Sequence, residues 1–145
     1  MSQIFEILLV EDNPYDAELT LNALKINNLD SKVYWVENGE QALDFLFGRG
    51  EYTGQDISIK PKLILLDLKL PKENGMEVLE KIKSDEKMKT IPVVILTSSK
   101  ETSDIKKCYK LGVNSFVVKP VDSEEFTKSV SELGLYWLGL NQPPE

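Results

Sequence analysis

Short apolar runs recur along the chain, and stretches with apolar residues at helical spacing separate them. A short uninterrupted apolar run is typical of a strand buried on both faces of a parallel sheet. The run at residues 63–67 is the clearest, because aliphatic residues lead directly into Asp67. The runs predict strands at residues 5–10, 33–36, 63–67, 91–96 and 115–118.

Helical periodicity follows each predicted strand. The first helix begins at Asn13 and Pro14, because Asn is a good N-cap and Pro suits the first helical position. The last begins at Asp122, with glutamates in the first turn, where the helix dipole favours them. The apolar positions of the other helices lie within residues 42–47, 76–82 and 105–111. This alternation predicts an α/β fold, a doubly wound parallel sheet with helices on both faces.

Two segments depart from the alternation. Residues 48–61 hold three glycines and mixed charge, so we expect a long surface loop that is either functional or a tolerated insertion. The last helix continues through residues 135–140, which are more apolar than one inward-facing stripe requires. This excess predicts either a homodimer through the fourth helix, fifth strand and fifth helix, or packing of the tail onto its own domain.

Length and composition are those of one globular domain. The 145 residues are 41% hydrophobic and 28% charged, and we expect order from about residue 4 to residue 140, with 141–145 as a frayed tail. The net charge of −7 argues against nucleic-acid binding. No apolar stretch approaches the ~20 residues of a membrane span. The N-terminus lacks a signal-peptide core, so we expect a cytoplasmic protein without a membrane partner.

The chain contains no histidine. It therefore cannot carry phosphohistidine, use a Ser-His-Asp triad or build a metal site with histidine ligands. Any metal would bind to oxygen ligands, which suit Mg²⁺ or Ca²⁺ better than zinc.

Chemically active side chains stand where four of the predicted strands end. The carboxyl ends of parallel strands form one rim of an open sheet, and ligand sites lie there. Each residue alone has a simpler explanation, such as a helix start, a turn aspartate or a solvated lysine, but their conjunction on one rim is far more specific. The residues are Glu11 and Asp12 after the first strand, Asp67 after the third, Thr97 and Ser98 at the fourth, and Lys119 after the fifth.

The acids at this rim predict a metal site. Clustered carboxylates repel one another, and a hard divalent cation removes the repulsion. We expect Asp12 and Asp67 to ligate Mg²⁺ directly and Glu11 to hold a coordinated water. The backbone carbonyl of Lys69 is expected to reach the same ion.

The same rim predicts phosphoryl chemistry. With its charge neutralised, Asp67 can attack a phosphoryl group through a carboxylate oxygen. Lys119 can hold one phosphate oxygen as a point cation, and the Thr97 hydroxyl and the Ser98 amide can hold another. Movement of Thr97 toward the phosphate would leave space that Phe116 could fill.

As a set, these motifs resemble the receiver domain of two-component response regulators, from residue 4 to about 140. The matching stretches are residues 7–13, 65–71 with Gly75, 92–98 and 117–120. The resemblance implies a flavodoxin-like (βα)5 fold with strand order 2-1-3-4-5, a histidine kinase as partner and a cis Lys119–Pro120 bond. It assigns Asp67 as phosphoacceptor, Glu11 and Asp12 as metal-binding acids, Thr97 and Phe116 as the switch pair, and Lys119 as the lysine that pairs with phosphate.

Within this family the chain is similar to small stand-alone regulators that serve phytochromes. The similarity lies in the long 48–61 segment, residues 68–72 and residues 136–138. It implies a phytochrome-type sensor kinase as phosphoryl donor and an unknown downstream protein as target. With no effector domain after residue 145, we expect a stand-alone phosphorelay protein and not an enzyme. Lys69, two residues after the acceptor, is expected to slow the loss of phosphate.

Other functions remain open. A pseudo-receiver would act as an interaction module without phosphorylation, although such modules usually lose an acid, the hydroxyl or the lysine, and all are present here. A flavin- or nucleotide-binding enzyme would need a glycine-rich loop after the first strand, where residues 11–14 stand instead. A haloacid-dehalogenase-type phosphatase would need a second acid where Lys69 stands.

Overall fold

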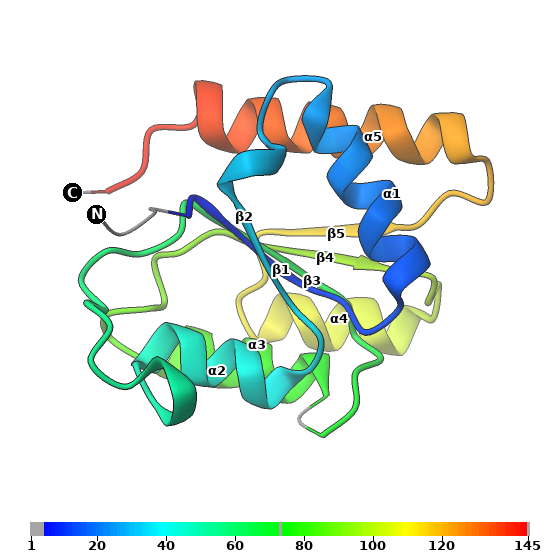
Figure 1. Cartoon of the computed structure of the whole chain (residues 1–145). Helices are drawn as coiled ribbons and strands as arrows, with labels where there is room; N and C mark the ends of the chain where they lie inside the picture. The colour runs from blue at the N-terminus through cyan, green and yellow to red at the C-terminus, as the bar shows by residue number, and fades with distance from the viewer. Residues whose placement is uncertain (1–4, 73, 145) are drawn as a thin grey trace.

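A single parallel sheet forms the centre of the molecule. The computed structural model describes residues 5–72 and 74–144, and in this part five parallel strands lie in the order β2-β1-β3-β4-β5 (Figure 1). Both the doubly wound architecture and the flavodoxin-like strand order are therefore confirmed. The strands are β1 (Ile7–Val10), β2 (Val33–Val36), β3 (Leu63–Leu66), β4 (Val93–Thr97) and β5 (Ser115–Val118).

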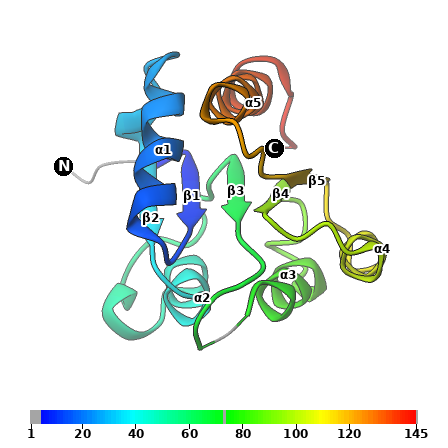
Figure 2. The ribbon, with the colours of Figure 1, turned by 90° about the vertical axis from the view of Figure 1, so that its right-hand side faces the viewer.

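Helices cover both faces of this sheet. Figure 2 shows α1 and α5 on one face and α2, α3 and α4 on the other. Within the described residues, α5 continues as expected through Tyr136–Leu140, but this part is a short π-helix, a form that the sequence did not indicate. The helices are α1 (Pro14–Lys25), α2 (Gly39–Phe47), α3 (Gly75–Ser84), α4 (Thr102–Lys110) and α5 (Ser123–Leu135).

The central strands supply both halves of the core. Alternate residues of a strand point to opposite faces, so Leu8 and Val10 pack against the α2–α4 side while Ile7 and Leu9 pack against α1 and α5. The side chains of β3 alternate between the two faces of the sheet in the same way. All residues of β1 and β3 are buried, which explains why their sequences are continuously apolar and do not alternate.

The start of α1 follows the local sequence. Asn13 caps the helix, because its side-chain oxygen accepts hydrogen bonds from the backbone N–H groups of Tyr15 (2.9 Å) and Asp16 (3.2 Å). Pro14 occupies the first helical position, where it removes no hydrogen bond. This local capping aims the first turn of α1 toward the end of β1.

The long segment after α2 is anchored to the domain. It contains a short 3₁₀-helix at Gly50–Tyr52. The Tyr52 ring lies edge-on to Tyr34 and Phe45, at centroid distances of 5.9 and 5.4 Å, and the two tyrosine hydroxyls are 2.9 Å apart. The expected surface loop is thus fastened by aromatic contacts to β2 and α2.

Several local expectations need correction. Of the apolar positions expected within residues 105–111, Cys108 is fully buried, whereas Ile105 and Leu111 are half-buried, because α4 lies near the sheet edge. The Lys119–Pro120 bond is trans, which is the intrinsically favoured form of an X–Pro bond. Residue 4, where order was expected to begin, and residue 145, the last residue of the expected tail, lie outside the described residues. Along the part that is described, no helix is both long and apolar enough to cross a membrane.

Candidate functional site

Strand register places the first two acids side by side. Val10 of β1 pairs with Leu66 of β3, so Glu11 and Asp67 leave the sheet at the same level. The backbone N–H of Asp67 donates to the carbonyl of Val10 at 3.1 Å, which extends the pairing by one residue. The rim expected from the strand ends is therefore present.

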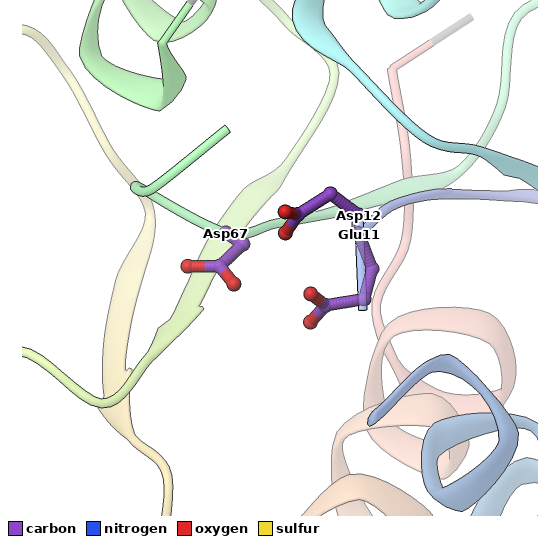
Figure 3. Close-up of side chains that lie close together, drawn as sticks. All are labelled: Glu11, Asp12 and Asp67. Atoms are coloured by element: carbon purple, nitrogen blue, oxygen red, sulfur yellow. The ribbon is translucent and has the colours of Figure 1, made fainter. Parts of the chain in front are cut away.

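Three carboxylates converge at this rim. One oxygen each from Glu11, Asp12 and Asp67 lie within 4.8 Å of one another, and Figure 3 shows the three carboxylates close together, with those of Glu11 and Asp12 extending toward Asp67. Glu11 is 3% exposed and Asp67 is 9% exposed, whereas Asp12 faces solvent. Ligands on opposite sides of one Mg²⁺ lie about 4.2 Å apart, so this donor set fits a hard divalent cation after small movements.

One lysine joins these acids. Lys119 directly follows β5, and its backbone N–H donates to the carbonyl of Thr97 at 2.7 Å. Its ammonium nitrogen lies 2.8 Å from Glu11 Oε1, 3.2 Å from Asp16 Oδ2 and 3.4 Å from Asp67 Oδ2. The lysine side chain is only 12% exposed, so water screens these ion pairs weakly.

The electrostatics of the site follow from burial and charge. Burial raises the pKa of the Glu11 carboxyl; the ion pair with Lys119 opposes that effect, and the charge of Asp67 reinforces it. Burial alone would lower the pKa of Lys119, but its hydrogen bond to Glu11 and the charges of the surrounding acids raise that pKa overall. Lys119 therefore remains a cation, surrounded by more negative charge than it can neutralise.

Backbone groups and one glycine hold the acids in place. The N–H of Asn13 donates to Glu11 Oε2, and the N–H of Lys69 donates to Asp67 Oδ1, each at 3.2 Å. A side chain at Gly75 would collide with the backbone carbonyl of Asp67 and would lie 2.6 Å from the Cα of Leu68. The absence of a side chain at Gly75 therefore lets α3 begin directly against the Asp67 loop.

The response regulator receiver domain family matches residues 7–131 of the chain. This chain is a response regulator receiver domain. Receiver domains are signalling proteins that interact with histidine kinases and bind a divalent metal at the acidic site. The acidic cluster described above is consistent with that metal site.

Curated relatives match almost the whole receiver domain. The probable methanogenesis regulatory protein FilR2 of Methanothrix harundinacea is 41% identical over 140 residues, 97% of this chain and 88% of the relative. Response regulator Rcp1 of Synechocystis is 40% identical over 132 residues, 91% of this chain and 88% of Rcp1.

Solved structures extend the similarity to phytochrome-linked proteins. The phosphorylated cyanobacterial phytochrome response regulator RcpA has a TM-score of 0.89 at 38% identity, over 99% of this chain and 100% of RcpA. The Mn²⁺-bound form of Rcp1 has a TM-score of 0.87 at 38% identity, over 96% and 98% of the chains. The bacteriophytochrome response regulator RtBRR has a TM-score of 0.76 at 48% identity, over 98% and 85%.

The remaining predicted residues of the receiver domain lie around the acids. Thr97 ends β4, is fully buried, and accepts a hydrogen bond at Oγ1 from the N–H of Ser99 at 3.4 Å. Ser98 is exposed beside it. Phe116 is half-buried on β5 and packs against the core under α2–α4. Their switch and phosphate-binding roles, like ligation by the Lys69 carbonyl, remain predictions.

Sequence reasoning missed Asp16, the second acid paired with Lys119. Asp16 lies in the first turn of α1, where an acid is usually explained by the helix dipole. The available signal was its position in the first turn of a helix whose start is fixed at the rim by Asn13. Sequence reasoning also missed Trp35, whose indole N–H donates to the Glu11 carbonyl at 2.7 Å.

Proposed function

We propose that this receiver domain accepts a phosphoryl group from a sensor histidine kinase on Asp67 and thereby changes its protein partners. The observation that supports it is the convergence of Glu11, Asp12 and Asp67 at one rim, where the buried ammonium of Lys119 pairs with Glu11 and Asp67. A pseudo-receiver would not need to keep so much like charge together, because clustered carboxylates destabilise a fold unless they serve a ligand.

In this proposal each side chain has a defined task. An Asp67 carboxylate oxygen forms the bond to phosphorus, and the histidine nitrogen of the kinase leaves with the electron pair of the broken bond. Mg²⁺, bound by Asp12, Asp67 and the Lys69 carbonyl with Glu11 through water, would neutralise charge on the transferring group. Lys119 holds one phosphoryl oxygen.

The proposed switch uses the carboxyl end of β4 and Phe116 on the neighbouring strand β5. The Thr97 hydroxyl and the Ser98 amide bind another phosphoryl oxygen, and Phe116 moves inward behind Thr97. Phe116 is half-buried in the structure, so it has room to change its exposure. Phosphorylation then biases a two-state equilibrium and does not build a new fold.

The kinase is proposed to be of the phytochrome type, and the relay to operate in the cytoplasm, where ATP supplies the phosphoryl group. RcpA and RtBRR, named for phytochrome and bacteriophytochrome, support this choice. A phosphotransfer screen against purified sensor kinases should show the fastest initial rate with a phytochrome-type kinase. A faster transfer from another class would contradict the assignment.

Slow dephosphorylation is proposed to follow from Lys69. Its side chain is exposed while its backbone N–H contacts Asp67, which leaves the long cation beside the path of a hydrolytic water. Lys69→Asn should then lose phosphate faster than the wild type. An unchanged rate of phosphate loss would contradict this role of Lys69.

A homodimer through α4, β5 and α5 is proposed as the signalling assembly. Leu135, Tyr136 and Leu140 at the end of this face are exposed, Leu140 at 73%. Sedimentation with and without phosphorylation measures the assembly directly. A monomeric mass in both states would contradict the proposed homodimer.

The central test is labelling by a small phosphodonor. Wild-type protein should be labelled in the presence of Mg²⁺ and not with EDTA, and Asp67→Asn should not be labelled. Glu18→Gln, which removes an exposed acid of α1, is the matched control and should be labelled normally. Unlabelled wild type under all conditions would favour the pseudo-receiver.

A further inference from the structure

Asp16 is the only described partner of Lys119 that lies outside the predicted set, and it comes from a helix and not from a strand end. Its Oδ2 is 3.2 Å from the ammonium, closer than the Asp67 oxygen at 3.4 Å. The cap at Asn13 fixes the position of this turn, since the Asn13 side chain accepts from the Asp16 N–H. The contact is thus built into the start of α1.

The ammonium of Lys119 is fully engaged in the unmodified domain. A lysine has three N–H donors, and three carboxylates from Glu11, Asp16 and Asp67 already accept from it. A phosphoryl group on Asp67 adds strong acceptor oxygens and about −1.5 to −2 charge. A phosphoryl oxygen can take the place of the Asp67 oxygen on the ammonium, but its added negative charge then lies beside the Glu11 and Asp16 carboxylates, and this repulsion is relieved only if one of the two acids moves away.

The solvent exposure of the Glu11 and Asp16 side chains decides which of the two moves away from Lys119. The Glu11 side chain is 4% exposed and cannot leave the ammonium without becoming an unpaired buried charge. The Asp16 side chain is 31% exposed and can turn into water. Its carboxylate also lies within two hydrogen-bond lengths of the Asp67 oxygen, so it repels a phosphoryl group there.

We propose that Asp16 is a positioning residue that competes with the phosphoryl group for Lys119 and so sets how tightly the site holds phosphate. This inference rests on the proposed function of Asp67. In the unmodified domain Asp16 holds the lysine among the acids. In the phosphorylated domain its carboxylate repels the phosphoryl group and competes with it for the ammonium, which makes the phosphorylated state less favourable than in a domain without this acid.

The test compares two ligands of the same site, Mg²⁺ alone and beryllofluoride with Mg²⁺, a phosphoryl mimic. Tryptophan fluorescence can report both, because the Trp35 indole donates to the Glu11 carbonyl. Asp16→Asn should bind the mimic about three- to tenfold more tightly, the size of a partly screened charge pair. Its Mg²⁺ affinity should stay the same or fall, because a nearby negative charge is lost.

The matched variants separate this role from a general charge effect. Glu18→Gln removes one exposed acid from the same helix and should leave both affinities unchanged, while Asp16→Glu should behave like the wild type. Equal or weaker mimic binding by Asp16→Asn overturns the inference, as does a parallel rise in both affinities. Failure of the wild type itself to bind the mimic would instead contradict the proposed function.

Discussion

Replacement of Asp67 by asparagine should stabilise the metal-free fold. The Asp67 carboxylate lies within 4.8 Å of carboxylate oxygens of Glu11 and Asp12, and each pair repels by about 3.5 kcal/mol at an effective dielectric constant of about 20. Its attraction to Lys119 across 3.4 Å is about 5 kcal/mol on the same scale. The balance favours removal of the charge by about 2 kcal/mol, and solvent around Asp12 reduces this gain to about 1–2 kcal/mol.

Mg²⁺ should reverse the order of stability of the wild type and Asp67→Asn. Asparagine keeps the side-chain oxygen that accepts from the Lys69 N–H, so the variant loses little besides charge. Mg²⁺ at 100 times its dissociation constant stabilises the wild type by about 2.7 kcal/mol. Asp67→Asn loses a proposed metal ligand and should gain much less. The wild type should therefore be the less stable protein in EDTA and the more stable one in excess Mg²⁺.

The assay is urea denaturation followed by tryptophan fluorescence, with EDTA and with Mg²⁺. Mildly alkaline pH keeps Glu11 ionised despite its raised pKa. Glu18→Gln serves as the charge control and should differ from the wild type by less than about 0.5 kcal/mol in either condition. A metal-free Asp67→Asn protein that is less stable than the wild type would refute the electrostatic argument.

Two further predictions concern parts of the fold away from the acids. A Cβ at Gly134 would lie 2.7 Å from Cδ2 of the fully buried Leu24, so Gly134→Ala should destabilise the fold by about 1–3 kcal/mol in urea denaturation. Gly139→Ala, with its nearest contact at 3.6 Å, should be neutral or slightly stabilising in the same assay. Burial raises the pKa of Glu6, but its ion pairs with two lysines outweigh burial and lower that pKa below 4.5. The folded pKa thus lies below the unfolded one, so these pairs stabilise the fold above pH 4.5 and stop doing so as the pH falls. Glu6→Gln should lower the free energy of unfolding by about 0.5–1 kcal/mol at neutral pH. If the wild type and Glu6→Gln differ by the same amount at neutral and at acidic pH, this prediction is wrong.

The acidic site shows how much of a functional site the pattern of apolar strands can predict. Burial on both faces forces β1 and β3 to be continuously apolar, so the first polar residue after each run marks its carboxyl end. Because parallel strands end on one rim, Glu11 and Asp67 could be placed together without coordinates. The Asn13 cap was equally accessible, since capping depends only on residues within one turn.

The sequence by itself determined the strands, the helix starts and the residues of the rim, because burial periodicity and capping act over a few residues. Only the tertiary structure decided which acids share Lys119. Asp16 and Lys119 are separated by 103 positions along the chain, and no local pattern encodes that ion pair. The same holds for Tyr52, which fastens the long loop to Tyr34 through a contact between separate elements. Pairings of this kind depend on helix direction and side-chain reach, which are set only when the elements pack together.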